Sequence, residues 1–136
     1  MKQFIGLAMG TIIGAALGAG AVSELHAQAK SPVYLVAEVS VTNPQGYGKE
    51  FVPKINASIK AGGGQVIAVG GGRGKRAQKI VALEGKPPSH VIIHRWESMD
   101  ALKAWWNGAA AKAARKIGHK YAKFRIFAFK GAASGQ

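Results

Sequence analysis

Hydrophobic and polar residues alternate along residues 33–41, and this alternation predicts the first β-strand of the chain. The odd positions carry only Val, Leu and Ala, whereas the even positions carry Tyr34, Val36, Glu38 and Ser40. One face of the predicted strand is therefore uniformly apolar. The other face mixes apolar side chains with a carboxylate, which must be either paired or in contact with water.

Hydrophobic residues then recur every four positions, a pattern that predicts the buried stripe of an amphipathic helix. The stripe consists of Tyr47, Phe51, Ile55 and Ile59. Asn43 and Pro44 precede it, and they supply an N-cap residue followed by proline at the first helical position. Pro53 lies inside the stripe and should kink or split the helix, and the three glycines at 62–64 should end it.

The rest of the pattern predicts further strands and a second helix. The expected strands are residues 65–69, 90–96 and 124–129, with 79–83 as a further strand or strand extension. Ser98 is expected to cap the second helix, which Asn107-Gly108 interrupts. An alanine-rich continuation follows over 109–117, with Lys112, Arg115 and Lys116 on its wet side.

The element order β-α-β-(β)-β-α-β predicts an α+β domain with a ferredoxin-like split βαβ plan. Such a plan gives an antiparallel sheet with two main helices on one face and leaves the other face bare. A set of sheet residues is too apolar to leave both faces wet: Tyr34, Val36, Ile92, Trp96 and Phe127. We therefore expect a homodimer in which a second copy packs sheet to sheet.

Residues 1–29 have the features of a secretory signal peptide. Lys2 gives a positive start, residues 4–22 carry no charge, and Ala27-Gln28-Ala29 matches a cleavage site. Cleavage would leave a single domain over 30–131 and a short tail, 132–136, in the periplasm or outside a bacterial cell, with no membrane contact. The alternative is a retained anchor, because 19 uncharged residues could span a bilayer.

Charge and composition narrow the possible partners. The chain has 19 Lys and Arg against 6 Asp and Glu, a net charge of +13, and no cysteine. Such a surface can attract acidic polymers, but the charges are scattered. The basic segment 70–76 lacks the spacing of a phosphate-binding loop, although Arg73 could grip an anion. No aromatic platform accompanies these charges, so specific nucleic-acid binding is not expected.

His94 is the leading candidate for chemistry, because a histidine titrates near neutral pH. It shares a strand face with Ile92 and Trp96, and we expect that face to line a cavity. Depending on the strand register, Glu38 should pair with His94 or with Arg95. A Glu38–His94 pair would be an acid/base couple, and a Glu38–Arg95 pair would be a structural ion pair. His90 and His94 are about 13 Å apart along a strand, too far to share a metal ion, so no metal site is expected.

A series of short motifs along residues 32–131 is shared with one known family. The motifs are Tyr34 to Pro44, Gly63-Gly64, Gly70-Gly71, Ala82-Leu83-Glu84-Gly85, Ser98 to Leu102 and Trp105-Trp106. In their order and spacing they resemble the domain of unknown function family 1330, within the dimeric α/β-barrel superfamily. The resemblance implies a dimer in which each sheet faces a barrel-like interior. The superfamily includes cofactor-independent monooxygenases, haem-degrading enzymes and binding modules, so the fold alone does not define the chemistry.

The chain also departs from that family at two places. Trp96-Glu97-Ser98 stands where the family has aromatic-Pro-Ser, and residues 108–111 stand where it has Ser-Pro-x-Tyr. A tyrosine that could line the pocket is therefore absent, and no role at that position transfers to this chain.

Three hypotheses about function follow from these features. The first is an exported homodimeric domain that binds a small anionic or aromatic molecule, with Tyr34, Trp96, Arg95 and Arg73 as candidate ligand-binding residues. The second is a cofactor-independent enzyme, monooxygenase-like or isomerase-like, that uses His94 with Glu38 or Tyr47. The third is a basic module for acidic cell-surface polymers. No cofactor is expected in any of them.

Overall fold

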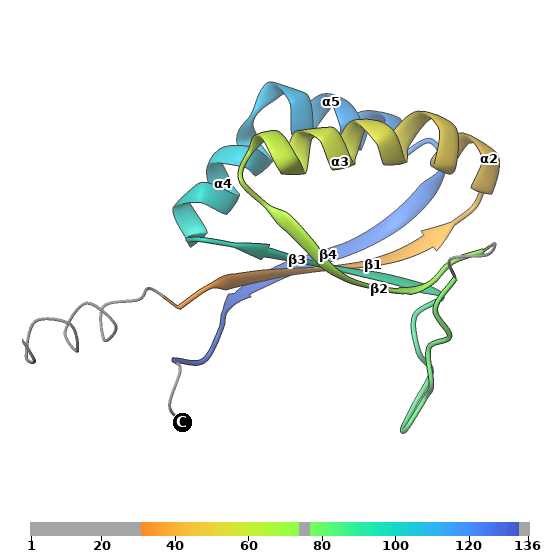
Figure 1. Cartoon of the computed structure of the whole chain (residues 1–136). Coiled ribbons are helices and arrows are strands. Elements are labelled where there is room, and N and C mark those ends of the chain that lie inside the picture. The colour runs from red at the N-terminus through yellow and green to blue at the C-terminus, as the bar shows by residue number, and fades with distance from the viewer. Residues whose placement is uncertain (1–30, 74–76, 134–136) are drawn as a thin grey trace, which may run out of the picture.

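The alternating strands form one antiparallel sheet, and the helices cover one of its faces (Figure 1). This computed structural model describes residues 31–73 and 77–133. The predicted signal peptide or anchor, 1–29, and the end of the predicted tail, 134–136, lie outside the described residues. Within the two described ranges, no helix combines the length and the apolar character that a bilayer crossing requires.

The strands and helices follow the predicted order. The strands are β1 (Val33–Val41), β2 (Gln65–Gly71), β3 (His90–Trp96) and β4 (Ala122–Lys130), arranged β2-β3-β1-β4. The helical segments are α2 (Pro44–Gly46), the π-helix η1 (Tyr47–Phe51), α3 (Val52–Ala61), α4 (Met99–Asn107) and α5 (Ala109–Gly118). The predicted α+β class, with an antiparallel sheet and helices on one face, is confirmed.

Pro53 changes the hydrogen bonding of the first helix. Proline has no backbone N–H to donate to the carbonyl four residues earlier. Just before it, the N–H of Val52 donates to the carbonyl of Tyr47, which closes a π turn. In an α-helix, a stripe repeated every four residues drifts by about 40° at each step. The wider π turn compensates part of that drift, so Tyr47 and Phe51 are both buried, with ring centroids 5.1 Å apart.

The two faces of the sheet have different surroundings. We call the face under the helices the inner face; it carries the odd positions of β1 together with His90, Ile92, His94 and Trp96 of β3. The outer face carries Tyr34, Val36, Glu38 and Arg95, and from β4 Arg125, Phe127 and Phe129. The five apolar residues that led to the dimer prediction are thus divided between the two faces. Ile92 and Trp96 point toward the helices, and the other three lie on the outer face.

The predicted strand over 79–83 is wrong. Among the described residues, the β-pairing of this segment with β2 is limited to an isolated bridge between Gly71 and Gln78. Gly71 and Gly72 have φ angles of 73° and 88°, which turn the chain out of the sheet, and Pro87 and Pro88 cannot donate to a ladder. Residues 78–89 instead form an arm that projects beyond the sheet on the side away from the helices (Figure 1).

Candidate functional site

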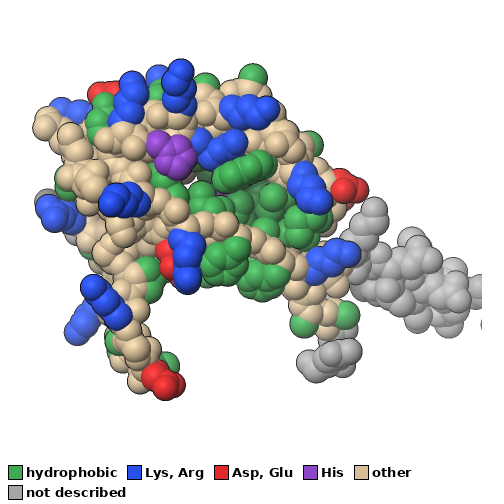
Figure 2. All heavy atoms as spheres, turned by 180° about the vertical axis from the view of Figure 1, so that it is seen from behind, with side chains coloured by type: hydrophobic (Ala, Val, Ile, Leu, Met, Phe, Trp, Pro, Cys, Tyr) green, Lys and Arg blue, Asp and Glu red, His purple; other side chains and the backbone are tan. Residues whose placement is uncertain are grey.

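A cavity of about 420 Å³ lies between the inner face of the sheet and the helices. All four strands and the helical layer contribute to its wall. The hydrophobic lining consists of Leu35, Ala37, Val39, Phe51, Val52, Ile55, Ile59, Val66, Val69, Ile92, Trp105, Trp106, Phe124 and Ile126. Figure 2 shows hydrophobic side chains gathered in a hollow between the helical layer and the sheet, with Lys and Arg side chains around it. The pocket belongs to a single chain, on the side of the sheet opposite to the expected barrel interior.

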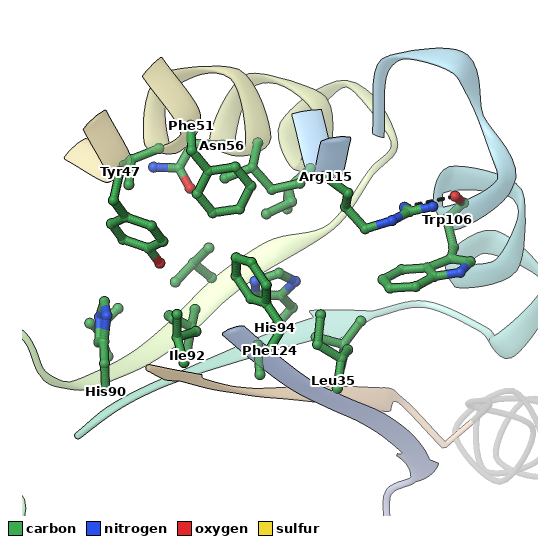
Figure 3. A pocket seen from close by; sticks show the side chains of 18 of the residues that line it. Leu35, Tyr47, Phe51, Asn56, His90, Ile92, His94, Trp106, Arg115 and Phe124 are labelled. Atoms are coloured by element: carbon green, nitrogen blue, oxygen red, sulfur yellow. Dashed lines mark hydrogen bonds between the residues drawn. The ribbon is translucent and has the colours of Figure 1, made fainter. Parts of the chain in front are cut away.

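Six polar side chains interrupt this apolar wall: Tyr47, Asn56, His90, His94, Arg115 and His119. Figure 3 shows Tyr47 and His90 at one end of the pocket and Arg115 with Trp106 at the other, with His94 between them. The pocket therefore has polar groups at both ends and His94 near its centre, all set in an apolar wall.

Tyr47 presents its hydroxyl at one end, because the π turn directs its ring toward the sheet (Figure 3). Its ring lies edge-on to that of His90, with centroids 6.1 Å apart. Burial raises the pKa of Tyr47 to about 12, since the phenolate would lose its hydration. At neutral pH the hydroxyl is protonated and can donate a hydrogen bond.

His94 occupies the floor of the pocket and is only 6% exposed. Burial lowers its pKa to about 4, because the imidazolium would be poorly solvated there. The ring is neutral at pH 7, and it stands edge-on to Trp105 at a centroid distance of 6.1 Å. The Trp105 indole is fixed in turn, since its Nε1–H donates to the Ser58 hydroxyl over 3.1 Å.

Both histidines of β3 retain unused hydrogen-bonding capacity. Among the described residues, no group bonds to Nδ1 of His90 or Nδ1 of His94, although both atoms are buried. Burial also lowers the pKa of His90. Buried polar atoms normally have partners, so these two nitrogens mark positions where a bound molecule could supply them.

Within residues 31–73 and 77–133, no three side chains among His, Cys, Asp and Glu lie close enough together to hold a metal ion.

Residues 32–132 match the model of the family described as a domain of unknown function, DUF1330. The chain belongs to this family. The match spans the whole sheet and its helical layer, which confirms the resemblance seen in the motifs. No curated protein matches the chain.

Solved structures similar to this DUF1330 domain share its fold at low sequence identity. A protein of unknown function from Rhodopseudomonas palustris has a TM-score of 0.58 and 13% identity, over 87% of this chain and 96% of its own. SnoaB, a cofactor-independent oxygenase from Streptomyces nogalater, has a TM-score of 0.54 and 15% identity, over 77% of this chain and 97% of its own. A proposed antibiotic biosynthesis monooxygenase from Caulobacter crescentus has a TM-score of 0.50 and 19% identity, over 82% and 99%. At such identities the likeness defines the fold and not the chemistry.

The DUF1330 domain brings two predicted site residues, His94 and Tyr47, to the same pocket. The predicted pairing of Glu38 with His94 or Arg95 is wrong. Glu38 lies on the outer face, where it accepts hydrogen bonds of 2.7 and 2.8 Å from Arg125. These bonds lower the pKa of Glu38. The register explains the error, because Glu38 stands opposite Val91 on β3 and opposite Arg125 on β4.

The predicted ligand-binding residues do not line the main pocket. Tyr34 and Arg95 lie on the outer face, and Arg73 is exposed beyond the end of β2. Trp96 is buried in the core and borders a smaller hollow of about 270 Å³ together with Arg95.

Four residues that line the pocket were not predicted from the sequence as site residues: Asn56, Trp106, Arg115 and His119. Arg115 was placed on the wet side of its helix. The spacing contains a contrary signal, because Ala111 is buried and Arg115 follows it by four residues, which puts both on neighbouring parts of one helical face. The neighbouring charges Lys112 and Lys116 are exposed, as predicted, so the sequence groups Arg115 with them on the wet side.

Proposed function

We propose that this domain binds a small aromatic molecule in the pocket between the sheet and the helices. The observation that carries this proposal is the neutral, buried His94 at the floor of an apolar cavity of about 420 Å³. Small-molecule sites typically have volumes of about 300–1,000 Å³, with apolar walls and a few converging polar groups. Flat aromatic walls from Phe51, Phe124 and Trp106 favour a flat, aromatic ligand.

The polar groups suggest how such a molecule would be held. Tyr47 can donate a hydrogen bond, and a neutral histidine can accept one at one ring nitrogen while donating at the other. A hydroxyl or carbonyl group on the ligand would supply a partner to Nδ1 of His94 or to Nδ1 of His90, neither of which has one among the described residues.

A second candidate is catalysis without a cofactor, with His94 as the proton acceptor. Its support is the neutral state of His94 at pH 7 and the fold shared with the oxygenase from Streptomyces nogalater. A base whose conjugate acid has a pKa of about 4 is weak, so proton transfer to it from a phenol-like substrate is unfavourable. Binding is therefore the leading proposal and catalysis the second.

We further propose that the domain acts as a homodimer after export. The outer face exposes Phe127 and Phe129 at 44% and 49%, with Tyr34 and Val36 beside them in the register. An apolar sheet face of this kind is typical of an interface with a second copy. Export rests on the sequence pattern of residues 1–29 alone.

An NMR titration with 2-naphthol tests the binding proposal. We expect saturable shifts of pocket residues, and an affinity about 3- to 10-fold lower in His94→Leu, which removes a neutral hydrogen bond but keeps an apolar volume. Arg95→Leu is the matched control, because Arg95 is the next residue along β3 and points to the outer face. Equal affinities in both variants would remove His94 from the site. Shifts outside the pocket would remove the site itself.

Oxygen uptake with 1,4-dihydroxynaphthalene separates the second candidate from the first, since a cofactor-free oxygenation needs a substrate that can itself reduce O₂. Proton transfer by His94 should make the parent at least about 100-fold faster than His94→Leu. Equal oxygen uptake by the two proteins would contradict the catalytic proposal and leave binding as the proposed function.

A further inference from the structure

Arg115 is a cation inside the apolar pocket. It extends from α5 toward the cavity (Figure 3), and its guanidinium carbon lies 3.7 Å from the centroid of the Trp106 ring. One guanidinium N–H donates to the backbone carbonyl of Trp106 over 2.9 Å. A guanidinium group has five N–H donors, so this bond positions the group while other donors remain available.

No acidic side chain balances this charge among the described residues that line the pocket. The ion pair found in the described residues, Glu38 with Arg125, lies on the outer face of the sheet. Burial lowers the pKa of Arg115, which reflects the cost of partly desolvating the cation. A bound anion would offset that cost, because a partly buried charge is stabilised by an opposite charge with good geometry.

The opposite end of the pocket and the floor at its centre are neutral. Tyr47 keeps its proton, and His90 and His94 have pKa values lowered by burial, so none of these three groups carries charge at pH 7. The pocket thus has one cationic end, with neutral hydrogen-bonding groups at its centre and at its other end, all set in an apolar wall (Figure 3). A ligand that matches this asymmetry has an anionic group at one end of an apolar body.

We propose that the ligand is an aromatic monocarboxylate, held with its carboxylate on Arg115 and its ring extending toward His94. This assignment deepens the proposed function and rests on it. A carboxylate suits the planar fork of a guanidinium group. A phosphate dianion would need further cationic or N–H donors, and Arg115 is the only Lys or Arg residue in the described lining. Lys and Arg side chains around the hollow (Figure 2) would also raise the local concentration of anions.

A comparison of 2-naphthoate with 2-naphthamide at pH 7 tests this assignment on the full chain. The two probes have nearly the same shape, but only the first carries a charge. We expect the parent to bind 2-naphthoate about 10- to 100-fold more tightly than 2-naphthamide, as is typical for a charge-assisted hydrogen bond. In Arg115→Gln that preference should disappear, with the affinity for the amide unchanged.

Lys116→Gln is the matched control. It removes one positive charge from the neighbouring position of α5, on a side chain that is exposed and does not line the pocket. Its preference for the carboxylate should stay within about 2-fold of the parent's, since exposed charges act weakly through solvent. Arg115→Lys keeps the charge without the fork and should retain part of the preference. This partial rescue would not be expected if Arg115 only stabilised α4 through the Trp106 carbonyl.

The outcomes distinguish this assignment from the proposed function. Equal binding of the two probes by the parent, with no change in Arg115→Gln, would overturn the carboxylate assignment and leave an aromatic-binding pocket. A similar loss of preference in Lys116→Gln would trace it to general surface charge and also overturn the assignment. If neither probe shifts a pocket residue at millimolar concentration, both the assignment and the proposed function fail.

Discussion

The inner and outer faces of the same four strands hold their polar side chains in different ways. On the outer face, Glu38 and Arg125 are charged, and each satisfies the other. On the inner face, His94 is neutral, and its Nδ1 bonds to no described residue. The outer face thus has the features of a protein interface, whereas the inner face has the features of a small-molecule site.

This difference arises from solvent access. Water and a nearby arginine stabilise a carboxylate on the open face at little cost, and such exposed pairs contribute little to stability. Under the helices, water is largely excluded, so an ionisable group there becomes neutral or requires a partner from elsewhere. An unpartnered buried group is therefore better evidence for a site than a paired exposed one.

The largest effect should come from the core of the inner face. Trp96 is 1% exposed and is packed against Trp105, at a centroid distance of 4.9 Å, and against Gly64, where any side chain would collide with its ring. Trp96→Ala should lower the free energy of unfolding by about 3–5 kcal/mol, measured by urea unfolding followed by circular dichroism. Phe129→Ala, on the outer face, should cost well under half as much. Similar losses in both variants would show that the two faces are equally well packed.

The next effect concerns the charge state of His94. Its pKa is about 4 in the folded protein and near 6.5 when unfolded, so the unfolded chain binds more protons between these values. Stability is therefore unaffected above about pH 6.5 and falls as the pH decreases toward 4. The loss should reach about 3 kcal/mol by pH 4, relative to His94→Gln measured in the same buffers. His90 is present in both proteins, so its contribution cancels. Parallel pH profiles would contradict the lowered pKa.

The outer face gives the third prediction. Light scattering of the parent should give twice the mass of one chain, and Phe127→Asp should raise the dimer dissociation constant at least about 100-fold, because a carboxylate would have to be buried at the interface. Lys112→Asp, on an exposed position of α5, is the control and should remain dimeric. A parent that stays monomeric at micromolar concentration would leave the exposed phenylalanines without the proposed partner.

The smallest effect should come from the outer ion pair. Glu38→Gln removes a carboxylate on the open face of the sheet, whose side chain is 27% exposed and whose partner Arg125 is 74% exposed, so its effect on unfolding should be less than about a quarter of that of Trp96→Ala. Urea midpoints of the two variants, compared at low and high salt, measure this ratio. A large loss would place the pair inside an interface and would strengthen the dimer proposal.

The features that follow from neighbouring residues could be predicted from the sequence. Asn43 accepts a hydrogen bond from the N–H of Gly46, and Ser98 accepts one from the N–H of Ala101, each as its N-cap position implies. The alternation in β1 likewise predicts which residues share a face, because the period of a strand is 2.

The features that depend on distant parts of the chain could not be predicted. Whether Glu38 meets His94, Arg95 or Arg125 depends on strand order and register, and β1 has a neighbour on each side. The end of the pocket at Arg115 depends on where one long side chain at the edge of the buried face of α5 extends, which packing decides and the residue pattern does not. His94 could be predicted as a pocket residue because the alternation within a single strand places it on the same face as Ile92 and Trp96.

The π turn gives the first helix a place where its length can change without turning Tyr47. Five residues span about one turn where the N–H of Val52 bonds to the carbonyl of Tyr47, whereas an α-helix needs only four. Deleting one residue between Tyr47 and Phe51 would therefore let a regular α turn replace the π turn, and Tyr47 would still face the sheet. The same deletion within α3 would rotate everything before it by about 100° relative to the rest of the helix. Tyr47 would then turn away from the sheet, and the pocket would lose the hydroxyl at one end.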